Sequence, residues 1–428
     1  MDAGSKVAQA INLNSSNGGL TVLLIGNYGY DRQESMQRFA KVLADELPKH
    51  GVEVIVCNPA PLFGTLRPSA VGLGKWLGYI DKFIIFPVLL ARQLSSLKTQ
   101  CLERERGLVA HICDHSNAVY VRYLGTVGHL VTCNDLLAVR SALGEIKQNA
   151  TRWSGRFLQK MILAGLNRAQ RVACISEATG SDLLRISKLS PNRVGVIYMG
   201  QNHPYHPVPS ATARTRIARG LDGQEISDST FILHVGGNHW YKNRRAVLEI
   251  YGAMRTLMAS IGAAAIPRLV MIGPSPTSEM NVVLDRQPEL KAEVVFLQDI
   301  TNEELAAFYS VAELLLFPSI EEGFGWPISE AQACGCRVVT TGKAPMTEVG
   351  GGAAAYLSPA DVDGSDADGF ERAARGVVEI LNEDHSSRRQ RIERGLKNAA
   401  RFSTDGMVRQ YLETYREVIL RVTGSCLN

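Results

Sequence analysis

Residues 319–340, SIEEGFGWPISEAQACGCRVVT, are the stretch that says most about the fold. They predict the end of a strand, a glycine-rich loop, a short helix and the next strand. Pro327 suits the first helical position, and Gly335 suits a helix end in a left-handed backbone conformation. Glu322 then lies on the loop, and Glu330 lies in the early turns of the helix. Backbone N–H groups of the loop and the positive end of the helix predict a site for phosphate or sugar oxygens.

Short apolar runs alternate with helical patterns before and after this stretch. The runs that predict strands are residues 21–25, 52–57, 108–112, 118–121, 130–133, 171–175, 194–198, 231–235, 269–272, 294–297 and 314–317. Such alternation is typical of parallel sheets that carry helices on both faces and bind ligands at the carboxyl ends of their strands. A stretch at 203–209 with three prolines reads as a linker between two such series. The sequence therefore predicts an α/β protein with doubly wound parallel sheets.

Length and composition limit the class of protein. The 428 residues fit two large domains or three small ones, and 45% hydrophobic with 21% charged residues is typical of a globular enzyme. A net charge of +4 is too small to indicate nucleic acid as a partner. The eight cysteines form no Cys-x-x-Cys pair, which favours a reduced chain without a zinc or redox site. The polar N-terminus predicts no secretory signal, and no apolar run is long enough to span a bilayer, so we expect a cytoplasmic protein.

The stretch at 319–340 closely resembles the E-x7-E signature of retaining glycosyltransferases of family 4, with Glu322 and Glu330 as the two acids. The spacing alone is a weak signal, but the glycine-rich insert between the acids makes it specific. The resemblance extends over almost the whole chain and implies the GT-B architecture, in which two Rossmann-like domains face a cleft and a C-terminal helix crosses back. The expected parts are an acceptor-binding domain at 1–205, a nucleotide-sugar-binding domain at 206–404 and the returning helix at 405–428.

The same resemblance places Lys242 in the loop that grips the donor diphosphate. A compact ammonium group beside a glycine-ended strand can neutralise charge on a departing diphosphate. The alternative is a surface lysine at a helix start, where the helix dipole disfavours positive charge. Family members often carry an arginine where this chain has Gly237, and the sequence leaves open whether Arg244 or Arg245 replaces it.

Further donor contacts follow from the resemblance. Glu330 would hold the ribose hydroxyls, because a carboxylate can accept two hydrogen bonds from a vicinal diol, and Glu322 would lie against the transferred sugar. The alternative is that Glu330 only complements the helix dipole and that Glu322 is a solvated carboxylate on the loop. The predicted donor-binding residues are Gly237, Lys242, Asn243, Phe296, Leu297, Gly323, Phe324, Gly325, Trp326 and Glu330.

The first domain is expected to bind the acceptor. Asn134 stands where the family usually has a histidine that faces the transferred sugar, and a neutral amide can donate a hydrogen bond but cannot take a proton. Three of these positions also have a structural interpretation. Asp135 can cap the next helix, and Gly29 can be a turn glycine. The histidines near 111–115 can belong to a structural loop. The predicted acceptor-binding residues are Gly29, Tyr28, Asp31, His111, His115 and Asp135, and the predicted catalytic residues are Glu322, Lys242 and Asn134.

Two stretches suggest peripheral contact with a membrane. Residues 75–92 combine aromatic and apolar side chains with flanking cations, and residues 152–160 place a cation at every fourth position beside two aromatic side chains. The alternative is a pair of ordinary helices with a solvated cationic face. If the membrane reading holds, the acceptor is linked to a lipid and the enzyme rests on the inner face of the membrane.

Together these features predict a retaining hexosyltransferase that uses a nucleoside-diphosphate sugar and a glycan or polyprenyl-linked acceptor, with no cofactor and no bound metal. Lys242 and the helix after Pro327 would supply the countercharge for the diphosphate. One alternative is a sugar-nucleotide hydrolase or epimerase of the same fold, which would release nucleoside diphosphate without an acceptor. Another is a catalytically silent sugar-nucleotide-binding protein, suggested by Gly237 and Asn134. The sequence identifies neither the base, the sugar, the acceptor nor the oligomeric state.

Overall fold

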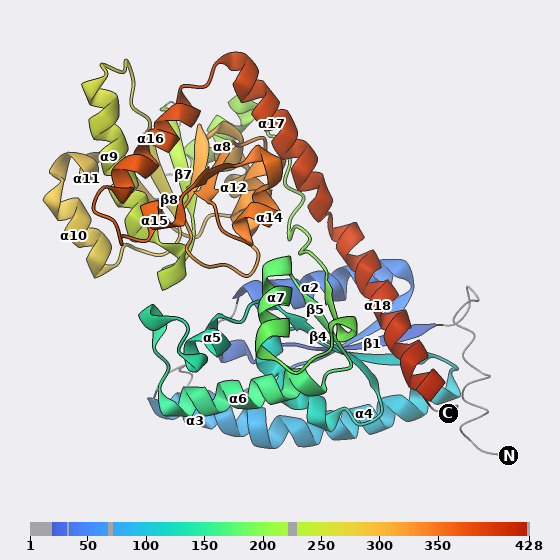
Figure 1. The fold of residues 1–428 in the computed structure, drawn as a ribbon. Coiled ribbons are helices and arrows are strands. Elements are labelled where there is room, and N and C mark those ends of the chain that lie inside the picture. Colours follow the sequence, from blue (N-terminus) through green and yellow to red (C-terminus); the bar gives the residue numbers. More distant parts are fainter. Residues whose placement is uncertain (1–18, 32–33, 67–71, 221–228, 426–428) are drawn as a thin grey trace. The chain divides into compact units, whose positions relative to one another are not determined.

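The computed structural model describes residues 19–31, 34–66, 72–220 and 229–425 (Figure 1). The chain divides into two compact units. The N-terminal unit comprises the chain up to Tyr198 together with the segment from Thr404 onward, and the C-terminal unit is Met199–Ser403. Each unit is built on one six-stranded sheet in which all neighbouring strands run parallel. The predicted α/β class with two parallel sheets is confirmed.

The sheet of the N-terminal unit has the strand order β2-β1-β3-β4-β5-β6. Its strands are β1 Leu20–Ile25, β2 Val52–Cys57, β3 Gly107–Ile112, β4 Gly128–Cys133, β5 Arg171–Cys174 and β6 Val194–Val196. Every residue of β1 and β4 is buried, as expected for parallel strands covered on both faces. The pairing places Ile25 opposite Ile112, so the chain leaves β1 and β3 at the same level of the sheet.

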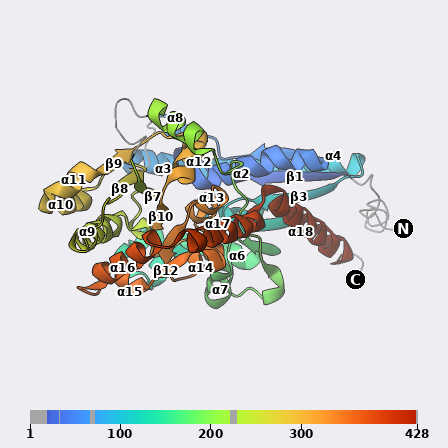
Figure 2. The same cartoon turned by 90° about the horizontal axis from the view of Figure 1, so that it is seen from above.

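Helices cover both faces of this sheet. They are α2 Glu34–Glu46, α3 Gly72–Ile80, α4 Phe86–Glu103, α5 Leu137–Leu143, α6 Trp153–Arg168, α7 Glu177–Ile186 and α18 Thr404–Ser425, and a π-helical turn, Asp81–Ile85, joins α3 to α4. Ala110 and Ile112 of β3 belong to one apolar core with α4 and α6. His111, between them, points to the opposite face and bonds to Tyr415 of α18. Figure 2 shows α18 beside β3.

One predicted strand is wrong. Residues 118–121 lie in a 3-10 helix, His115–Tyr123, instead of a strand. The Asp114 side chain accepts a hydrogen bond from the backbone N–H of Ser116 and starts this helix. The apolar run is buried against α6, where Gly165 approaches so closely that a β-carbon would lie 2.2 Å from the carbonyl oxygen of Ala118. An apolar run that is buried on all sides carries no period that would separate strand from helix.

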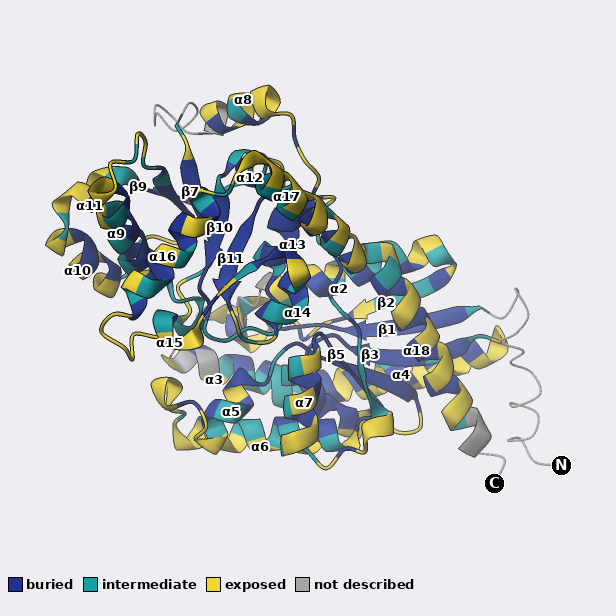
Figure 3. Ribbon diagram, turned by 45° about the horizontal axis from the view of Figure 1, so that its top comes forward, coloured by how far each residue is buried: buried dark blue, intermediate teal, exposed yellow. Residues whose placement is uncertain are grey.

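The sheet of the C-terminal unit has the order β12-β11-β10-β7-β8-β9. Its strands are β7 Phe231–Val235, β8 Arg268–Ile272, β9 Val294–Leu297, β10 Leu314–Phe317, β11 Val338–Thr341 and β12 Ala355–Leu357. Its helices are α8 Ser210–Gly220, α9 Arg244–Ser260, α10 Ser278–Arg286, α11 Pro288–Glu293, α12 Asn302–Val311, α13 Trp326–Ala333, α14 Met346–Gly350, α15 Pro359–Val362, α16 Gly369–Leu381 and α17 His385–Ala399. Figure 3 shows the strands of each unit as its most buried layer.

Candidate active site

Lys242 and Glu322 form an ion pair in the C-terminal unit. The distance from Lys242 Nζ to Glu322 Oε1 is 2.7 Å, and the two side chains are only 16% and 7% exposed. Lys242 ends a short turn after β7, and Glu322 lies on the loop after β10. Because β7 and β10 are neighbours in the sheet, their carboxyl ends bring the two residues together. Two of the predicted catalytic residues therefore meet at one edge of the sheet.

Asn243 holds this turn in place. Its backbone is left-handed, with φ of 54°, a conformation that asparagine adopts more readily than most residues. Its side-chain amide donates hydrogen bonds to the carbonyl oxygens of Pro318, at 3.0 Å, and Val362, at 2.7 Å. The predicted donor-binding residue Asn243 thus ties the Lys242 turn to the end of β10.

The glycine-rich loop leads into α13 through Gly325, whose φ of 101° is open mainly to glycine. Trp326 takes the first helical position, so Pro327 comes one residue later than predicted. Phe324 is buried with its ring 5.3 Å from that of Phe402, and the indole N–H of Trp326 donates to the carbonyl oxygen of Gly200. Both side chains serve the packing of the C-terminal unit, which leaves the loop backbone as the part suited to a ligand.

Glu330 lies within α13 and is buried. Tyr309 donates a hydrogen bond from its hydroxyl to Glu330 Oε2 over 3.0 Å. Burial, and next the negative charge of Glu330, raises the pKa of Tyr309 well above its usual value, so the phenol stays a donor. Tyr309 thereby fixes the orientation of this carboxylate.

The ends of β7 and β8 approach each other closely. Gly273 has a φ of 145°, and a β-carbon there would lie 2.1 Å from the carbonyl oxygen of Gly236. The backbone N–H of Gly236 donates to the carbonyl oxygen of Ile272. Gly237 follows directly, where a β-carbon would come within 3.2 Å of His239 Nδ1. Only glycine fits at Gly273, and the strand ends present bare backbone.

The structure distinguishes Arg244 from Arg245, the two candidates to replace the arginine that is missing at position 237. Arg245 is half exposed and pairs with Glu249 on its own helix. Arg244 is only 4% exposed, and its guanidinium carbon lies 6.0 Å from the ring centre of Phe296, a predicted donor-binding residue at the end of β9. Arg244 is therefore the arginine that reaches the carboxyl edge of the sheet.

The Arg244 guanidinium is only partly satisfied. Its Nη1 donates to Asn238 Oδ1 and to the carbonyl oxygen of Pro274. Nε and Nη2 are buried and have no hydrogen-bond partner within the described part of the chain. Burial lowers the pKa of Arg244 to about 10, which still leaves it charged at neutral pH. Nε and Nη2 form the edge of a guanidinium that binds an oxyanion with two parallel hydrogen bonds.

Other buried polar atoms at the same edge also lack partners. Across the described ranges, His234 Nε2, Ser319 Oγ and Thr341 Oγ1 make no hydrogen bond. His234 donates from Nδ1 to the carbonyl oxygen of Leu316, and burial lowers its pKa to about 3, so Nε2 is a free acceptor. Buried polar groups are almost always paired, so a set of unpaired ones at the strand ends indicates a ligand site. The sequence offered one signal for His234, a polar residue inside an apolar strand.

A second polar cluster lies in the N-terminal unit, at the carboxyl ends of β1, β3 and β4. Asp114 accepts hydrogen bonds from Asn27 Nδ2 over 2.6 Å, from Ser116 Oγ over 2.5 Å and from Asn134 Nδ2 over 3.4 Å. His115 Nδ1 lies 3.2 Å from Asp114 Oδ1. The structure thus brings together Asn134 and His115, which the sequence assigned to catalysis and acceptor binding.

Asp114 and His115 shift each other's pKa. Burial alone would raise the pKa of Asp114 and lower that of His115, but the close contact of the two side chains reverses both effects. The carboxyl pKa is therefore held below its usual range, and the imidazole pKa is raised. His115 follows β3, the strand next to the one that ends before Asn134.

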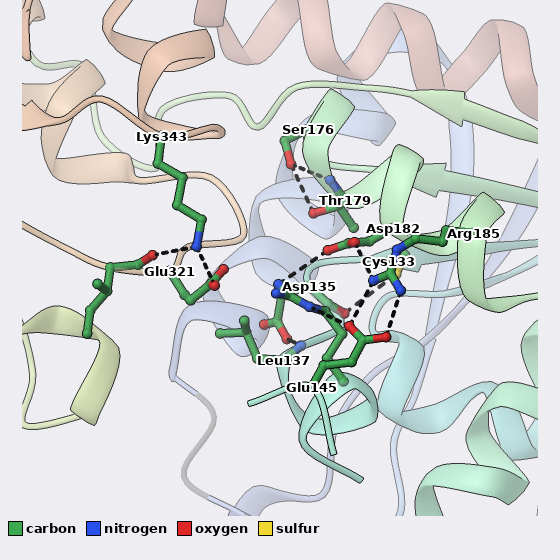
Figure 4. Close-up of polar contacts among 12 residues, drawn as sticks. Cys133, Asp135, Leu137, Glu145, Ser176, Thr179, Asp182, Arg185, Glu321 and Lys343 are labelled. Carbon is green, nitrogen blue, oxygen red and sulfur yellow. Dashed lines mark hydrogen bonds and ion pairs between the residues drawn. The ribbon is translucent and has the colours of Figure 1, made fainter. Parts of the chain in front are cut away.

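Asp135 and Glu321 have structural contacts (Figure 4). Asp135 Oδ1 accepts a hydrogen bond over 3.0 Å from the backbone N–H of Leu137, the first residue of α5, which fits the helix-capping alternative. In the C-terminal unit, Lys343 Nζ lies 2.5 Å from Glu321 Oε1, so the acid next to Glu322 has its own cation.

The remaining predicted acceptor residues lie elsewhere. His111 is buried, with Nδ1 bonded to the Tyr415 hydroxyl of α18 and Nε2 to the Thr132 hydroxyl of β4, both at 2.7 Å, so both nitrogens are already used. Tyr28 is buried and donates to Asp81, Asp31 pairs with Lys82, and Gly29 faces open space. The structure does not bring His111 or the Tyr28 hydroxyl into the polar cluster.

The described residues contain no group of three or more His, Cys, Asp or Glu side chains that could hold a metal ion.

Two parallel-sheet units with their polar clusters at the strand ends define a protein of the GT-B fold. Sucrose-phosphate synthase from Thermosynechococcus elongatus matches 94% of this chain and 100% of its own, with a TM-score of 0.66 and 18% identity. Anabaena HepE, solved in complex with UDP-glucose, matches 93% of this chain and 100% of its own, with a TM-score of 0.62 and 16% identity. The predicted fold class is confirmed.

The family models for Glycosyltransferase Family 4 and for Glycosyl transferases group 1 match residues 36–203 and 230–379, and the chain belongs to this family of glycosyltransferases. O-antigen chain mannosyltransferase B of Escherichia coli is 23% identical over 61% of this chain and 64% of its own. A D-inositol 3-phosphate glycosyltransferase of Thermobispora bispora is 29% identical over 59% of this chain and 57% of its own. The chain thus spans less than two thirds of these relatives.

Proposed function

We propose that this protein is a retaining, metal-independent hexosyltransferase that moves a hexose from a nucleoside-diphosphate sugar to a hydroxyl of a glycan or lipid-linked acceptor. The observation that carries the proposal is the Lys242–Glu322 ion pair, 2.7 Å long, at the carboxyl edge of the C-terminal sheet. In this proposal the cation serves the leaving group and the anion serves the sugar. A nearly buried ion pair costs desolvation free energy and adds little net stability, which favours a role in binding.

The donor diphosphate would bind between Lys242 and Arg244. Lys242 offers an ammonium group, and Arg244 offers the unpaired Nε and Nη2 donors. The N-terminus of α13 adds the positive end of a helix that follows the glycine-rich loop. Two cations and a helix end can together balance the charge of a diphosphate, and the buried surroundings strengthen each contact.

The nucleoside would lie toward β9 and α13. Glu330, held by Tyr309, would accept hydrogen bonds from the ribose hydroxyls. Phe296 and Leu297, at the end of β9, would lie beside the base. This placement leaves Glu322 for the sugar, since Glu322 comes from the loop next to the Lys242 turn.

Transfer with retention would occur on one face of the sugar. The bond between the anomeric carbon and the phosphate oxygen breaks, a bond to the acceptor oxygen forms, and the acceptor proton moves to the leaving phosphate oxygen. Glu322 would stabilise the positive charge that develops on the sugar ring, and Lys242 the negative charge on the phosphate. Asn134 donates from Nδ2 to Asp114 and to the carbonyl oxygen of Cys113, and its Oδ1 has no partner among the described residues, so Oδ1 would accept a hydrogen bond from a sugar hydroxyl. An amide takes no part in the proton transfer.

The relatives narrow the choice of donors to test first. One is named a mannosyltransferase, another a D-inositol 3-phosphate glycosyltransferase, and HepE was solved with UDP-glucose. Mannose and glucose donors therefore lead the panel, each with UDP, GDP and ADP as the nucleotide.

The test combines binding and turnover. A nucleotide that binds at a hundred times its Kd should stabilise the protein by about 2.7 kcal/mol, which raises the melting temperature of a unit of this size by about 5–10 °C. The matching nucleotide sugar should release nucleoside diphosphate only when an acceptor is present, and the product should keep the anomeric configuration of the donor. Release without an acceptor would indicate a hydrolase, an inverted product would refute retention, and the lack of any nucleotide response would refute the donor site.

A further inference from the structure

Large apolar side chains are exposed on one part of the N-terminal unit. Leu66, in the 3-10 turn Phe63–Leu66, is 72% exposed, and Trp153, the first residue of α6, is 82% exposed. Trp76 of α3, Ile84 of the π-helical turn and Phe157 of α6 are exposed as well. These five residues are called the apolar face below. A soluble monomer rarely exposes this many large apolar side chains in one region without a binding role.

The topology places these residues on one side of the sheet. The chain passes from β2 to β3 through α3 and α4, and from β4 to β5 through α6, and both connections step the same way across the strand order. Right-handed connections that step the same way lie on the same face of a sheet. α4 and α6 accordingly share one apolar core, and Figure 1 shows α3, α4 and α6 along the same side.

The apolar face also lies at the acceptor end of the unit. A helix that connects parallel strands begins near the carboxyl end of the strand before it. Ile84 precedes α4, and Trp153 and Phe157 lie within the first five residues of α6. In the second half of α4 most exposed positions are polar, and Leu102 is the large apolar exception. The apolar face thus lies at the edge that carries the Asp114–Asn134 cluster.

Asp81 connects the apolar face to the loop after β1. This buried carboxylate accepts hydrogen bonds from the backbone N–H groups of Leu62, Phe63 and Gly64 at 3.2, 2.9 and 2.9 Å. It also accepts one from the Tyr28 hydroxyl at 3.0 Å. The turn that carries Leu66 is therefore fixed to the predicted acceptor loop.

The start of α6 and the segment before it are rich in cations. Residues 146–160 contain four lysines and arginines and no acid. Arg152, Arg156 and Lys160 are exposed on α6. The side chain of Lys75, part of the stretch singled out from the sequence, lies outside the described residues. Exposed cations beside aromatic side chains match an anionic lipid surface, where each contributes about 1 kcal/mol of attraction.

A second copy of the chain fits this face less well. In a symmetric dimer the same patch meets itself, so the cations of α6 would face the cations of the partner copy. Like charges at an interface oppose association, whereas anionic headgroups neutralise them.

We propose that the apolar face docks the N-terminal unit on the surface of an anionic bilayer, with Trp153 and Phe157 in the headgroup region. No helix of the described chain combines the length and the hydropathy needed to cross a membrane. Docking presents the polar cluster at the strand ends to molecules held in the lipid surface. Resting on the proposed transferase activity, the structure assigns a lipid-linked acceptor to this cluster.

Docking is tested by flotation with two kinds of vesicle. One is phosphatidylcholine alone, and the other is phosphatidylcholine with a quarter phosphatidylglycerol. The full chain should float with the anionic vesicles and stay behind with the neutral ones. The W153S/F157S variant and the R152Q/R156Q/K160Q variant should each lose binding, the second by about a hundredfold, since a neutralised cation costs about fivefold. The matched controls are I261S/L420S and R389Q/R394Q/K397Q, which change exposed residues outside the face and should float as the wild type does.

Two further outcomes bear on the proposal. Wild-type chain that stays behind with anionic vesicles, or controls that lose binding as much as the face variants, would overturn docking. A dimer that dissociates in W153S/F157S without any vesicle binding would assign the face to self-association instead.

Nucleotide-induced stabilisation of the same variants separates this proposal from the transferase activity. The face variants should keep the full nucleotide response while they lose vesicle binding, so a failure of docking leaves the donor site unaffected. Transfer to a lipid-linked acceptor in vesicles should fall with docking, and transfer that stays at the wild-type rate in undocked variants would refute the lipid-linked acceptor.

Discussion

Replacement of Glu322 by glutamine removes one charge from the Lys242–Glu322 pair and keeps its shape. A hydrogen bond to a charged partner contributes about 1.5–3 kcal/mol and a neutral one about 0.5–1.5 kcal/mol, so the variant should lose about 1 kcal/mol of stability. For a unit of this size that lowers the melting temperature by about 2–4 °C. Transfer should fall about 100- to 1000-fold, as for the loss of one stabilising group in a transition state.

Nucleoside-diphosphate binding should respond in the opposite direction. Glu322 competes with a bound diphosphate for Lys242 and repels it, so the glutamine variant should bind nucleoside diphosphate as tightly as the wild type or up to about tenfold more tightly. Lys242→Met should instead weaken binding about 10- to 100-fold, since it removes a charged hydrogen bond. It should also lower stability more than the glutamine variant does, because it leaves the carboxylate of Glu322 nearly buried and unpaired.

Calorimetric titration, thermal unfolding and initial rates on the same preparations measure these effects. Glu321→Gln is the matched control, since this neighbouring carboxylate pairs with Lys343 and should keep both transfer and nucleotide binding near wild type. Full transfer by the Glu322 variant, or a loss of nucleotide binding as large as that of the Lys242 variant, would refute the roles assigned to the pair.

Three further changes have defined outcomes. Arg244→Met should stabilise the ligand-free protein, because it removes a buried charge with two unpaired donors. The same variant should bind nucleoside diphosphate at least tenfold more weakly. Denaturant unfolding measures the gain in stability, and calorimetric titration measures the loss of affinity. Gly273→Ala should lower both stability and nucleotide binding, because the new β-carbon meets the backbone of Gly236. Thermal scans with and without nucleotide measure both effects. An unchanged melting temperature together with an unchanged nucleotide response would contradict this prediction. His111 has a folded-state pKa of about 3 against 6.5 in the unfolded chain, so its stabilisation is complete above pH 6.5 and is lost as the pH falls toward 3. The titration of His111 should therefore lower the free energy of unfolding by about 2 kcal/mol from pH 7 to pH 5. In denaturant titrations, the free energy of unfolding of His111→Gln should depend less on pH than that of the wild type.

The sheets and the donor loop could be predicted because their signals are local. Parallel strands buried on both faces read as unbroken apolar runs, and the glycine-rich insert between Glu322 and Glu330 marks a loop before a helix. Pro327, Glu322 and Glu330 follow from one short stretch of sequence. Strand and loop positions of this kind depend on neighbours a few residues away.

The positions that were not predicted depend on distant contacts or on helix phase. The sequence leaves His111 open between acceptor binding and a structural loop, because its partner Tyr415 comes 304 positions later. Arg244 and Arg245 are neighbours in sequence, and only the rotation of α9 against the strand ends decides which one is buried. Ala118–Val121 reads as a strand because a fully buried 3-10 helix has the same composition.

The last helix has a consequence for the order in which the protein is made. Tyr411 and Tyr415 of α18 are fully buried against β3 and β4, so the core of the N-terminal unit is completed by a segment that is synthesised after the whole C-terminal unit. The C-terminal unit is continuous in the chain, and the backbone N–H of Gln201 near its start donates to the carbonyl oxygen of Phe402 near its end. The unit encoded second can therefore complete its fold first. A chain that ends just before Thr404 would lack part of the core of the N-terminal unit and keep the C-terminal unit whole.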